Sequence, residues 1–154
     1  MTFSLNRRLA IKYLLDSSVW LALAIQQHSA HARAKAFFNE KVEPNTILFC
    51  QATQQSFLRL LTTNSVLKHY DVPPLTNQQA WELYEGFESN PKVMIVGESV
   101  AFNRLWRELS ALKSASPKVW MDSYLAAFAI AHDYTLVTLD KDFTQYRNLK
   151  VRFL

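Results

Sequence analysis

Short apolar segments alternate with longer helical ones along this chain, and that alternation constrains the fold more than any other feature of the sequence. Strands are expected where an apolar run stops abruptly at polar residues, and helices where apolar residues recur every three or four positions. Such an alternation is typical of an α/β domain with a mostly parallel central sheet. The expected strands cover residues 12–15, 46–50, 93–96 and 136–139, with 151–153 as a short fifth strand at an edge.

Helices are expected in the intervals between these strands. Ser17 or Ser18 can cap the first helix, and Thr76 can cap a later one, because hydroxyl oxygens accept hydrogen bonds from the free N–H groups of a helix start. Pro117 favours another helix start, since proline is common in the first turn. The expected helices begin near residue 19 and at residues 31, 53, 76, 99 and 116, and the last five end near residues 40, 61, 87, 109 and 132.

Composition bounds both the number of domains and the class of fold. The chain has 154 residues, of which 49% are hydrophobic and 13% aromatic, which suffices for one well-filled core and is too little for two. We therefore expect a single domain over residues 1–154. The two glycines, Gly86 and Gly97, belong to neither glycine-rich phosphate-binding pattern, G-x-G-x-x-G or G-x-x-x-x-G-K-[ST]. Dinucleotide-binding folds and P-loop nucleotide triphosphatases are thereby excluded.

The charge of the chain favours an anionic partner. Seventeen basic residues outnumber thirteen acidic ones, for a formal charge of +4 and an isoelectric point of about 9.3, so nucleic acid is the first candidate. Residues 1–13 lack the long apolar stretch of a signal peptide, and no apolar run reaches the length that crosses a membrane. The lone thiol of Cys50 cannot form an internal disulfide. We expect a cytoplasmic protein with no membrane segment.

Three aspartates fall where a parallel sheet would bring them together. Asp16 ends the first expected strand and Asp140 ends the fourth, so both lie at the carboxyl edge, where ligands bind in open α/β sheets. Asp122 lies early in the helix that leads into the fourth strand, at the same edge if the crossover is right-handed. Taken singly, each aspartate fits a helix cap or a turn better than a site. Their shared edge favours a site.

Converging carboxylates repel one another, and a cation that neutralises them suits their chemistry. Oxygen donors are the ligands that Mg²⁺ and Mn²⁺ prefer. A metal held in this way can activate a water molecule and stabilise the charge that develops on a phosphoryl group. An acidic pocket in a basic chain therefore suggests phosphodiester hydrolysis.

Four segments, in order, resemble the PIN-domain toxins of the VapC type. Residues 14–23 (LLDSSVWLAL) resemble the opening of those toxins, and residues 57–62 (FLRLLT) resemble their middle stretch. Residues 121–129 (MDSYLAAFA) and 136–143 (LVTLDKDF) resemble their D-A-Y-L-A-A-F-A and V-T-x-D-x-D-F segments. The resemblance spans about residues 13–154, and the combination is more specific than any one segment.

The resemblance implies a PIN-like three-layer α/β/α domain with a mostly parallel sheet of four to five strands. It also implies Mg²⁺- or Mn²⁺-dependent endoribonuclease activity, an antitoxin that blocks the site, and a homodimer. Carried over by position, Asp16, Asp122 and Asp140 are the catalytic and metal-binding acids. Thr138 is the hydroxyl that supports them, and Asp142 is an auxiliary acid or a solvated turn residue.

The sequence departs from the family in one respect. PIN domains commonly supply a further carboxylate, usually Glu, from the helix after the second strand, whereas residues 53–59 (TQQSFLR) contain no acid. This places a second metal in doubt and leaves a PIN-fold module that binds RNA or protein without cutting as the alternative function. A phosphoacceptor domain of the receiver kind ranks lower, because serines follow Asp16 where that class needs a second acid.

Three basic residues are candidates for contacts with RNA phosphate. Lys118 and Lys141 lie beside two of the proposed acids, and Arg59 lies on an otherwise apolar helical segment. Arg59 could equally lay its stem along the packed helix. Trp81, Trp106 and Trp120 occur among apolar residues at helical spacing, which favours packing in the core or at an interface over stacking on bases.

Overall fold

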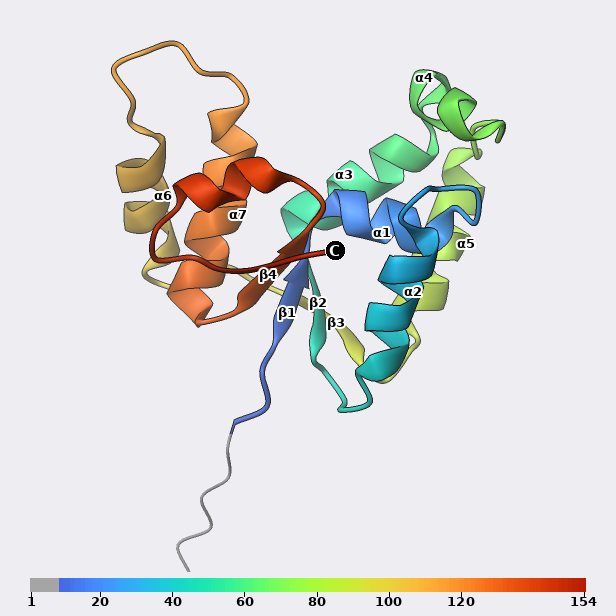
Figure 1. Cartoon of the computed structure of the whole chain (residues 1–154), viewed down its shortest axis with the longest axis horizontal. Helices are drawn as coiled ribbons and strands as arrows, with labels where there is room; N and C mark the ends of the chain where they lie inside the picture. The colour runs from blue at the N-terminus through green and yellow to red at the C-terminus, as the bar shows by residue number, and fades with distance from the viewer. Residues whose placement is uncertain (1–8) are drawn as a thin grey trace, which may run out of the picture.

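The computed structural model describes residues 9–154, and its centre is a five-stranded parallel sheet in the order β3-β2-β1-β4-β5 (Figure 1). Every neighbouring pair of strands runs parallel, as in the register that places Leu14 beside Leu48 and beside Leu136. The strands are β1 (Tyr13–Leu15), β2 (Ile47–Cys50), β3 (Val93–Val96), β4 (Thr135–Thr138) and β5 (Lys150–Phe153). The expected α/β class and all five expected strands are confirmed, β5 as an edge strand.

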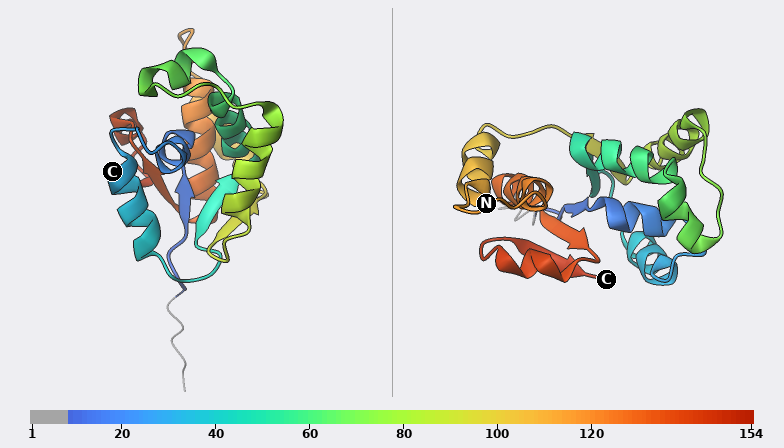
Figure 2. Two further views of the ribbon diagram at one scale, coloured as in Figure 1. Left: turned by 90° about the vertical axis from the view of Figure 1, so that its right-hand side faces the viewer. Right: turned by 90° about the horizontal axis from the view of Figure 1, so that it is seen from above.

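Helices cover both faces of this sheet and make a three-layer α/β/α arrangement (Figures 1 and 2). One face carries α1, α2, α3 and α5, and the other carries α6 and α7. The α-helices are α1 (Ser17–Ala24), α2 (His31–Glu40), α3 (Gln51–Leu61), α4 (Asn64–Leu67), α5 (Asn77–Glu88), α6 (Phe102–Ser110) and α7 (Val119–His132), and the 3₁₀ segments are η1 (Lys68–Tyr70) and η2 (Lys141–Gln145).

Adjacent residues of the inner strands feed two separate cores. Leu15 joins the core beneath α1, α2, α3 and α5, whereas Leu14 joins the core beneath α6 and α7. Both side chains are fully buried. This follows from the strand geometry, since successive side chains point to opposite faces, and a parallel sheet covered on both faces is apolar on both. The continuous apolar runs in the sequence are therefore the sign of this fold.

Aromatic packing joins β2 to the helices on one face. The ring of Phe49 stacks on that of Trp20 with centroids 3.7 Å apart and planes 7° apart. It also lies edge-on to Tyr84 at 4.9 Å and tilted to Phe57 at 5.9 Å. All four side chains are buried. Phe49 thus ties β2 to α1, α3 and α5, and the expectation that Trp20 lies in the core is confirmed.

Several element boundaries differ from those expected. Helix α1 begins at Ser17 with Asp16 as its N-cap residue, and no side chain caps it, so the expected role of Ser17 or Ser18 as caps is wrong. Helix α7 begins at Val119, after Pro117 rather than at it. Strand β4 ends at Thr138, one residue earlier than expected, and neither α4 nor the two 3₁₀ segments was expected. Helix ends are set by one or two hydrogen bonds, so they depend on tertiary contacts that sequence patterns do not contain.

Thr76 caps α5 as expected. Its hydroxyl accepts from the backbone N–H of Gln79 at 3.1 Å, and the Gln79 side chain accepts from the backbone N–H of Thr76 at 2.9 Å. At the other end of a helix, Asp133 ends α7 in the left-handed conformation at φ 59°. Aspartate tolerates that conformation better than most residues, so the chain ends this helix without a glycine.

No helix within residues 9–154 is long and apolar enough to cross a membrane. The expectation that no signal peptide is present concerns residues 1–13, of which residues 1–8 lie outside the described part of the chain.

Phe49→Ala should lower the free energy of unfolding by about 3–5 kcal/mol, because it removes a fully buried ring and leaves a cavity against Trp20. Urea denaturation measures the change. Leu112→Ala is the control, since Leu112 is 51% exposed and its truncation should change the free energy by about 0.5 kcal/mol or less. Equal effects of the two substitutions would contradict this account of the core.

Candidate active site at the carboxyl edge of the sheet

The structure brings the three predicted aspartates to one edge of the sheet. Asp16 follows β1 directly, Asp140 lies two residues beyond β4, and these strands are hydrogen-bonded neighbours. Asp122 lies in the first turn of α7, on the same side. The charges of Asp140 and Asp16 both raise the pKa of Asp122. The chain topology therefore places them as the sequence predicts.

Thr138 links two of these acids. Its buried hydroxyl donates to Oδ2 of Asp16 at 2.9 Å and accepts from the backbone N–H of Asp140 at 3.0 Å. The hydroxyls of Ser17 and Ser18 also donate to Asp16, at 3.3 and 3.4 Å. Burial raises the pKa of Asp16, and the hydrogen bond from Thr138 opposes that rise. The Asp16 carboxylate is thus held in one orientation by hydroxyl donors, with no ion pair to a described residue.

Lys118 lies among the other acids of the edge. Its ammonium group donates to Oδ2 of Asp140 at 3.1 Å, is 3.7 Å from Oδ2 of Asp122, and also bonds Oδ2 of Asp142. Together Asp16, Asp122, Asp140 and Lys118 are called the acidic cluster below. The three carboxylates around Lys118 raise its pKa, so it carries its charge at neutral pH. A single cation therefore neutralises part of the cluster.

Asp122 and Asp140, which both contact Lys118, respond differently to their surroundings. Burial raises the pKa of Asp122; the charge of Lys118 opposes the rise, and the charges of Asp140 and Asp16 add to it. The pKa of Asp140 is lowered, first because its carboxylate accepts the backbone N–H of Asp142 at 2.9 Å and also because it bonds Lys118. Asp122 is the more buried of the pair, with 13% of its side chain exposed against 36% for Asp140.

The donors of the cluster suit a hard divalent cation in kind. They are carboxylate and hydroxyl oxygens, the ligands of Mg²⁺ and Mn²⁺, and the cluster already surrounds a cationic group. As arranged, no three His, Cys, Asp or Glu side chains within residues 9–154 are close enough together to hold a metal. The donor types therefore fit a metal, but holding one requires the carboxylates to move closer together and the 60% exposed Lys118 side chain to leave Asp122 and Asp140.

The remaining candidate residues divide into those near the cluster and those away from it. Asp142 reaches the cluster through Lys118 and is 61% exposed. Lys141 lies over the ring of Phe153 at 4.3 Å and pairs with no acid of the described chain. Arg59 is exposed on α3 in a separate hollow that Leu58 and Trp81 also line, so it does not pair with the cluster.

Helix α3 contains no acidic residue, and Thr53 does not take the place of one at the cluster. Thr53, the hydroxyl nearest its start, is buried and turned back onto β2. Its Oγ1 donates to the carbonyl of Cys50 and accepts from the backbone N–H of Cys50, both at 3.0 Å. Thr53 therefore completes the helix start rather than the cluster.

Sequence reasoning missed two features of this edge. The bridging position of Lys118 was not foreseen, although its spacing of four residues before Asp122 places both on one side of a helix and was a usable signal. Tyr146 is the other. Its hydroxyl is buried without a hydrogen-bond partner among the described residues, and burial together with the charge of Asp122 raises its pKa to about 12. No sequence pattern pointed to it.

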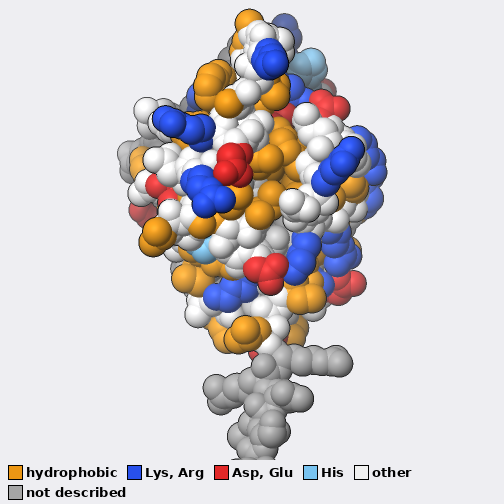
Figure 3. All heavy atoms as spheres, turned by 90° about the vertical axis from the view of Figure 1, so that its left-hand side faces the viewer, with side chains coloured by type: hydrophobic (Ala, Val, Ile, Leu, Met, Phe, Trp, Pro, Cys, Tyr) orange, Lys and Arg blue, Asp and Glu red, His pale blue; other side chains and the backbone are white. Residues whose placement is uncertain are grey.

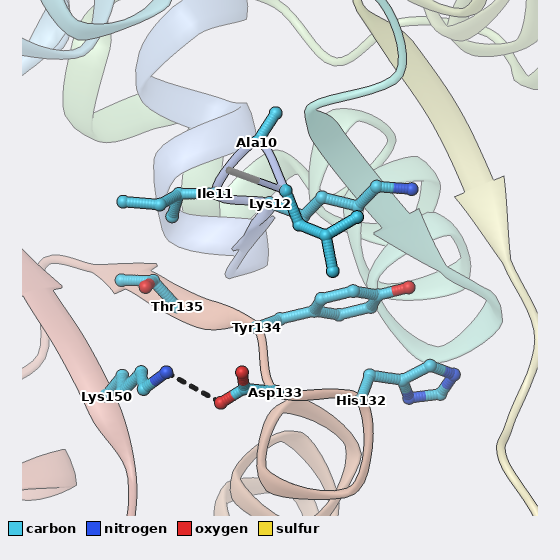
Figure 4. Close-up of a pocket in the computed structure, with 9 residues that line it drawn as sticks. Ala10, Ile11, Lys12, His132, Asp133, Tyr134, Thr135 and Lys150 are labelled. Carbon is cyan, nitrogen blue, oxygen red and sulfur yellow. Dashed lines mark hydrogen bonds and ion pairs between the residues drawn. The ribbon is translucent and has the colours of Figure 1, made fainter. Parts of the chain in front are cut away.

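A separate pocket lies at the opposite edge of the sheet (Figure 4). It is formed where β1, β4 and β5 begin, between Lys12, Tyr134 and Thr135. Its one carboxylate, Asp133, already pairs with Lys150 at 2.6 Å. This pocket offers no group of convergent acids, so the carboxyl edge remains the candidate active site.

Comparison with known proteins agrees with this geometry. Residues 13–149 match the family model described as PIN domain. The chain therefore belongs to the PIN domain family. It is similar to Ribonuclease VapC41 of Mycobacterium tuberculosis, 44% identical over 142 residues that cover 92% of this chain and 97% of that protein. Ribonuclease VapC31 of the same organism is 26% identical over 141 residues, covering 90% and 95%.

Solved structures share the fold at low sequence identity. The crystal structure of Mycobacterium tuberculosis VapC20, described as a sarcin-ricin loop cleaving toxin, has a TM-score of 0.64 at 16% identity and covers 92% of this chain and 99% of its own. DNA-bound VapBC from Salmonella typhimurium has a TM-score of 0.64 at 13% identity, covering 94% and 98%. The PIN-like three-layer fold expected from the sequence is thus confirmed.

Asp16→Asn should make the metal-free protein more stable at neutral pH. A carboxyl whose pKa is raised by folding favours the folded state when protonated, so its contribution to stability falls as pH rises above about 4, the usual value for Asp. The gain from Asp16→Asn should therefore be small near pH 4 and grow toward pH 8. Urea denaturation in EDTA measures it. A gain that does not change with pH, or a loss throughout, would contradict the raised pKa.

Proposed function

We propose that this chain is a metal-dependent endoribonuclease, a toxin of the VapC kind, that hydrolyses RNA phosphodiester bonds at the acidic cluster. The observation that carries the proposal is that Asp16, Asp122 and Asp140 lie at one carboxyl edge, where Lys118 contacts Asp122 and Asp140 and Thr138 bonds Asp16. The likeness to Ribonuclease VapC41 supports it, as does the positive charge of the chain. The expected ion is Mg²⁺ or Mn²⁺, held by these three acids.

In the proposed mechanism each residue of the edge has a separate task. When bound, the divalent cation supplies positive charge at the RNA phosphate and lowers the pKa of a water molecule. Thr138 fixes the orientation of Asp16, and the backbone N–H of Asp142 fixes that of Asp140. These hydrogen bonds restrain both carboxylates before any metal binds.

Lys118 has two positions in this mechanism. In the absence of metal it neutralises Asp122 and Asp140. With metal present, the cation would neutralise Asp122 and Asp140 instead of Lys118. The exposed four-carbon side chain of Lys118 would then let its ammonium group turn to an RNA phosphate. Lys118 thus belongs both to the cluster and to the path of the RNA backbone.

Asp16→Asn should reduce RNA cleavage at least about 100-fold, a loss of about 2.7 kcal/mol or more of transition-state stabilisation. The measurement is the rate at which total cellular RNA is cut by antitoxin-free protein with Mg²⁺, with Mn²⁺ and with EDTA. Asp133→Asn is the matched control, because Asp133 lies at the opposite edge and should keep full activity. Wild-type activity in folded Asp16→Asn would remove Asp16 from the site.

Lys118→Gln should tighten Mn²⁺ binding several-fold, because it removes a cation that occupies the same carboxylates. Isothermal titration calorimetry measures the affinity. Lys141→Gln is the matched control, since Lys141 contacts the ring of Phe153 and none of these acids. Unchanged or weaker Mn²⁺ binding in Lys118→Gln would show that Lys118 does not compete with the metal.

A second candidate function follows from the missing acid in α3. A PIN-fold module that binds RNA or protein without cutting needs no full set of metal ligands, and α3 supplies no carboxylate. This candidate predicts RNA binding that persists in EDTA together with no metal-dependent product. The cleavage assay above therefore separates the two functions.

We also propose a cognate antitoxin and a homodimer. Structurally similar chains include VapBC complexes, although identities of 13% to 16% limit that likeness to the fold. The exposed side chains of Asp140 and Asp142 leave the cluster accessible to a cationic group of a partner. A gene for a small DNA-binding protein directly upstream, whose product blocks cleavage, is the expected source of that partner.

A further inference from the structure

An open pocket of about 570 Å³ lies between α6 and the first turn of α7. We propose that this pocket, called the tryptophan pocket below, binds a nucleobase of single-stranded RNA beside the phosphate that is cut. Its main residues are Trp106, Trp120, Arg104 and Arg107. The inference rests on the proposed function, because it assumes that RNA reaches the acidic cluster.

Trp120 is a largely exposed aromatic residue that packs against Trp106. It is 59% exposed, although it lies in a helix whose following residues are mostly buried. The indole N–H of Trp106 donates to the carbonyl of Trp120 at 3.1 Å, and the two rings lie edge to face with centroids 6.2 Å apart. Trp106 is itself held by Tyr124 at 5.5 Å and by Phe102 at 5.8 Å. A braced, exposed indole is the kind of platform on which bases stack.

The charges around the pocket favour nucleic acid over an apolar partner. Arg104 and Arg107 line it, and none of its lining residues is acidic. Arg104 pairs with Glu108 at 3.0 Å, whereas Arg107 forms no ion pair with any residue of the described chain. Nucleotides satisfy both kinds of group, because the base has a flat apolar face and the phosphate accepts hydrogen bonds from guanidinium. Apolar side chains gather on this side of the molecule, with Lys, Arg and also acidic side chains around them (Figure 3).

The pocket and the acidic cluster lie on opposite sides of one helical turn. Lys118 and Asp122 face the cluster, and Trp120 lies two residues from each, which turns it by about 200° around α7. The two sites are therefore separated by roughly one helix diameter, about 10 Å. A short stretch of single-stranded RNA can cross the start of α7 with a phosphate at the cluster and a neighbouring base against Trp120.

Trp120→Ala should weaken the binding of a single-stranded RNA about tenfold, since aromatic stacking accounts for roughly that much per base. The probe is a fluorescein-labelled 12-nucleotide RNA of mixed sequence, and the readout is fluorescence anisotropy in an Asp16→Asn background with Mg²⁺, so that the probe is not cut. Trp120→Phe should retain most of the affinity. Trp81→Ala is the matched control, because Trp81 is 47% exposed on α5, away from this pocket.

Removing single bases from the probe locates the contact. In the Asp16→Asn protein that keeps Trp120, an abasic nucleotide at the contacting position should weaken binding. In the protein that also carries Trp120→Ala, an abasic nucleotide at that position should have no further effect, whereas the effects of other positions should remain. Unchanged RNA affinity in folded Trp120→Ala would overturn the proposal. It would also be overturned if each abasic position weakened binding equally in the proteins with and without Trp120, because the base and the indole would then not be in contact. Loss of a protein partner's binding with normal RNA binding would also overturn it.

The cleavage assay keeps this failure distinct from failure of the proposed function. Metal-dependent cleavage that needs Asp16, together with normal RNA binding by Trp120→Ala, rejects the tryptophan pocket and keeps the nuclease. Coupling between Trp120 and one base, together with no metal-dependent cleavage, keeps the pocket and rejects the nuclease. No RNA binding by the protein with Trp120 intact rejects the pocket.

Discussion

Repulsion among carboxylates at one edge of a parallel sheet is the constraint on which the rest of this structure depends. Asp122, Asp140 and Asp142 share one ammonium group, that of Lys118, and Asp16 is held instead by the hydroxyl of Thr138. Burial raises the pKa values of Asp16 and Asp122, so folding works against their charge. The divalent cation that we propose would remove this repulsion.

The sheet order makes this concentration of charge possible. Strands β1 and β4 are neighbours although more than a hundred residues separate them, and their carboxyl ends open on the same side. Helix α7 runs directly into β4, so its first turn returns to that edge with Lys118 and Asp122. The same turn carries Trp120 on its other side. One helical turn thereby contributes both to the acidic cluster and to the tryptophan pocket that we propose beside it.

Sequence patterns predicted the elements well because the inner strands β1, β2 and β4 are buried on both faces. The continuous apolar runs that end at Leu15 and at Cys50 are typical of buried parallel strands in an α/β chain. Asp16 and Asp140 could be placed at one edge for the same reason, since parallel strands end together. Helix starts were less predictable: Pro117 lies before α7, and Ser17 lies within α1 and bonds a carboxylate.

Side-chain direction and exposure were the features that sequence could not supply. Trp120 occurs in an apolar run and was expected to pack in the core or at an interface; the structure places it outside the core, exposed beside α6. The buried hydroxyl of Tyr146 reaches the cluster region from the segment between η2 and β5, which no local pattern connects to Asp122. The position of Arg59 in a separate hollow beside α3 was equally unpredictable, since only the packed structure shows which face of that helix points toward the cluster.

The chemical nature of the cut RNA ends tests the central claim most directly. If the acidic cluster directs water at the phosphate, early products formed with Mg²⁺ or Mn²⁺ in ¹⁸O-labelled water should carry linear phosphates with one solvent oxygen, and EDTA should prevent their formation. Products that end in 2′,3′-cyclic phosphate and form equally well in EDTA would show that the RNA's own 2′-hydroxyl attacks. That result would contradict a metal-dependent hydrolysis at Asp16, Asp122 and Asp140.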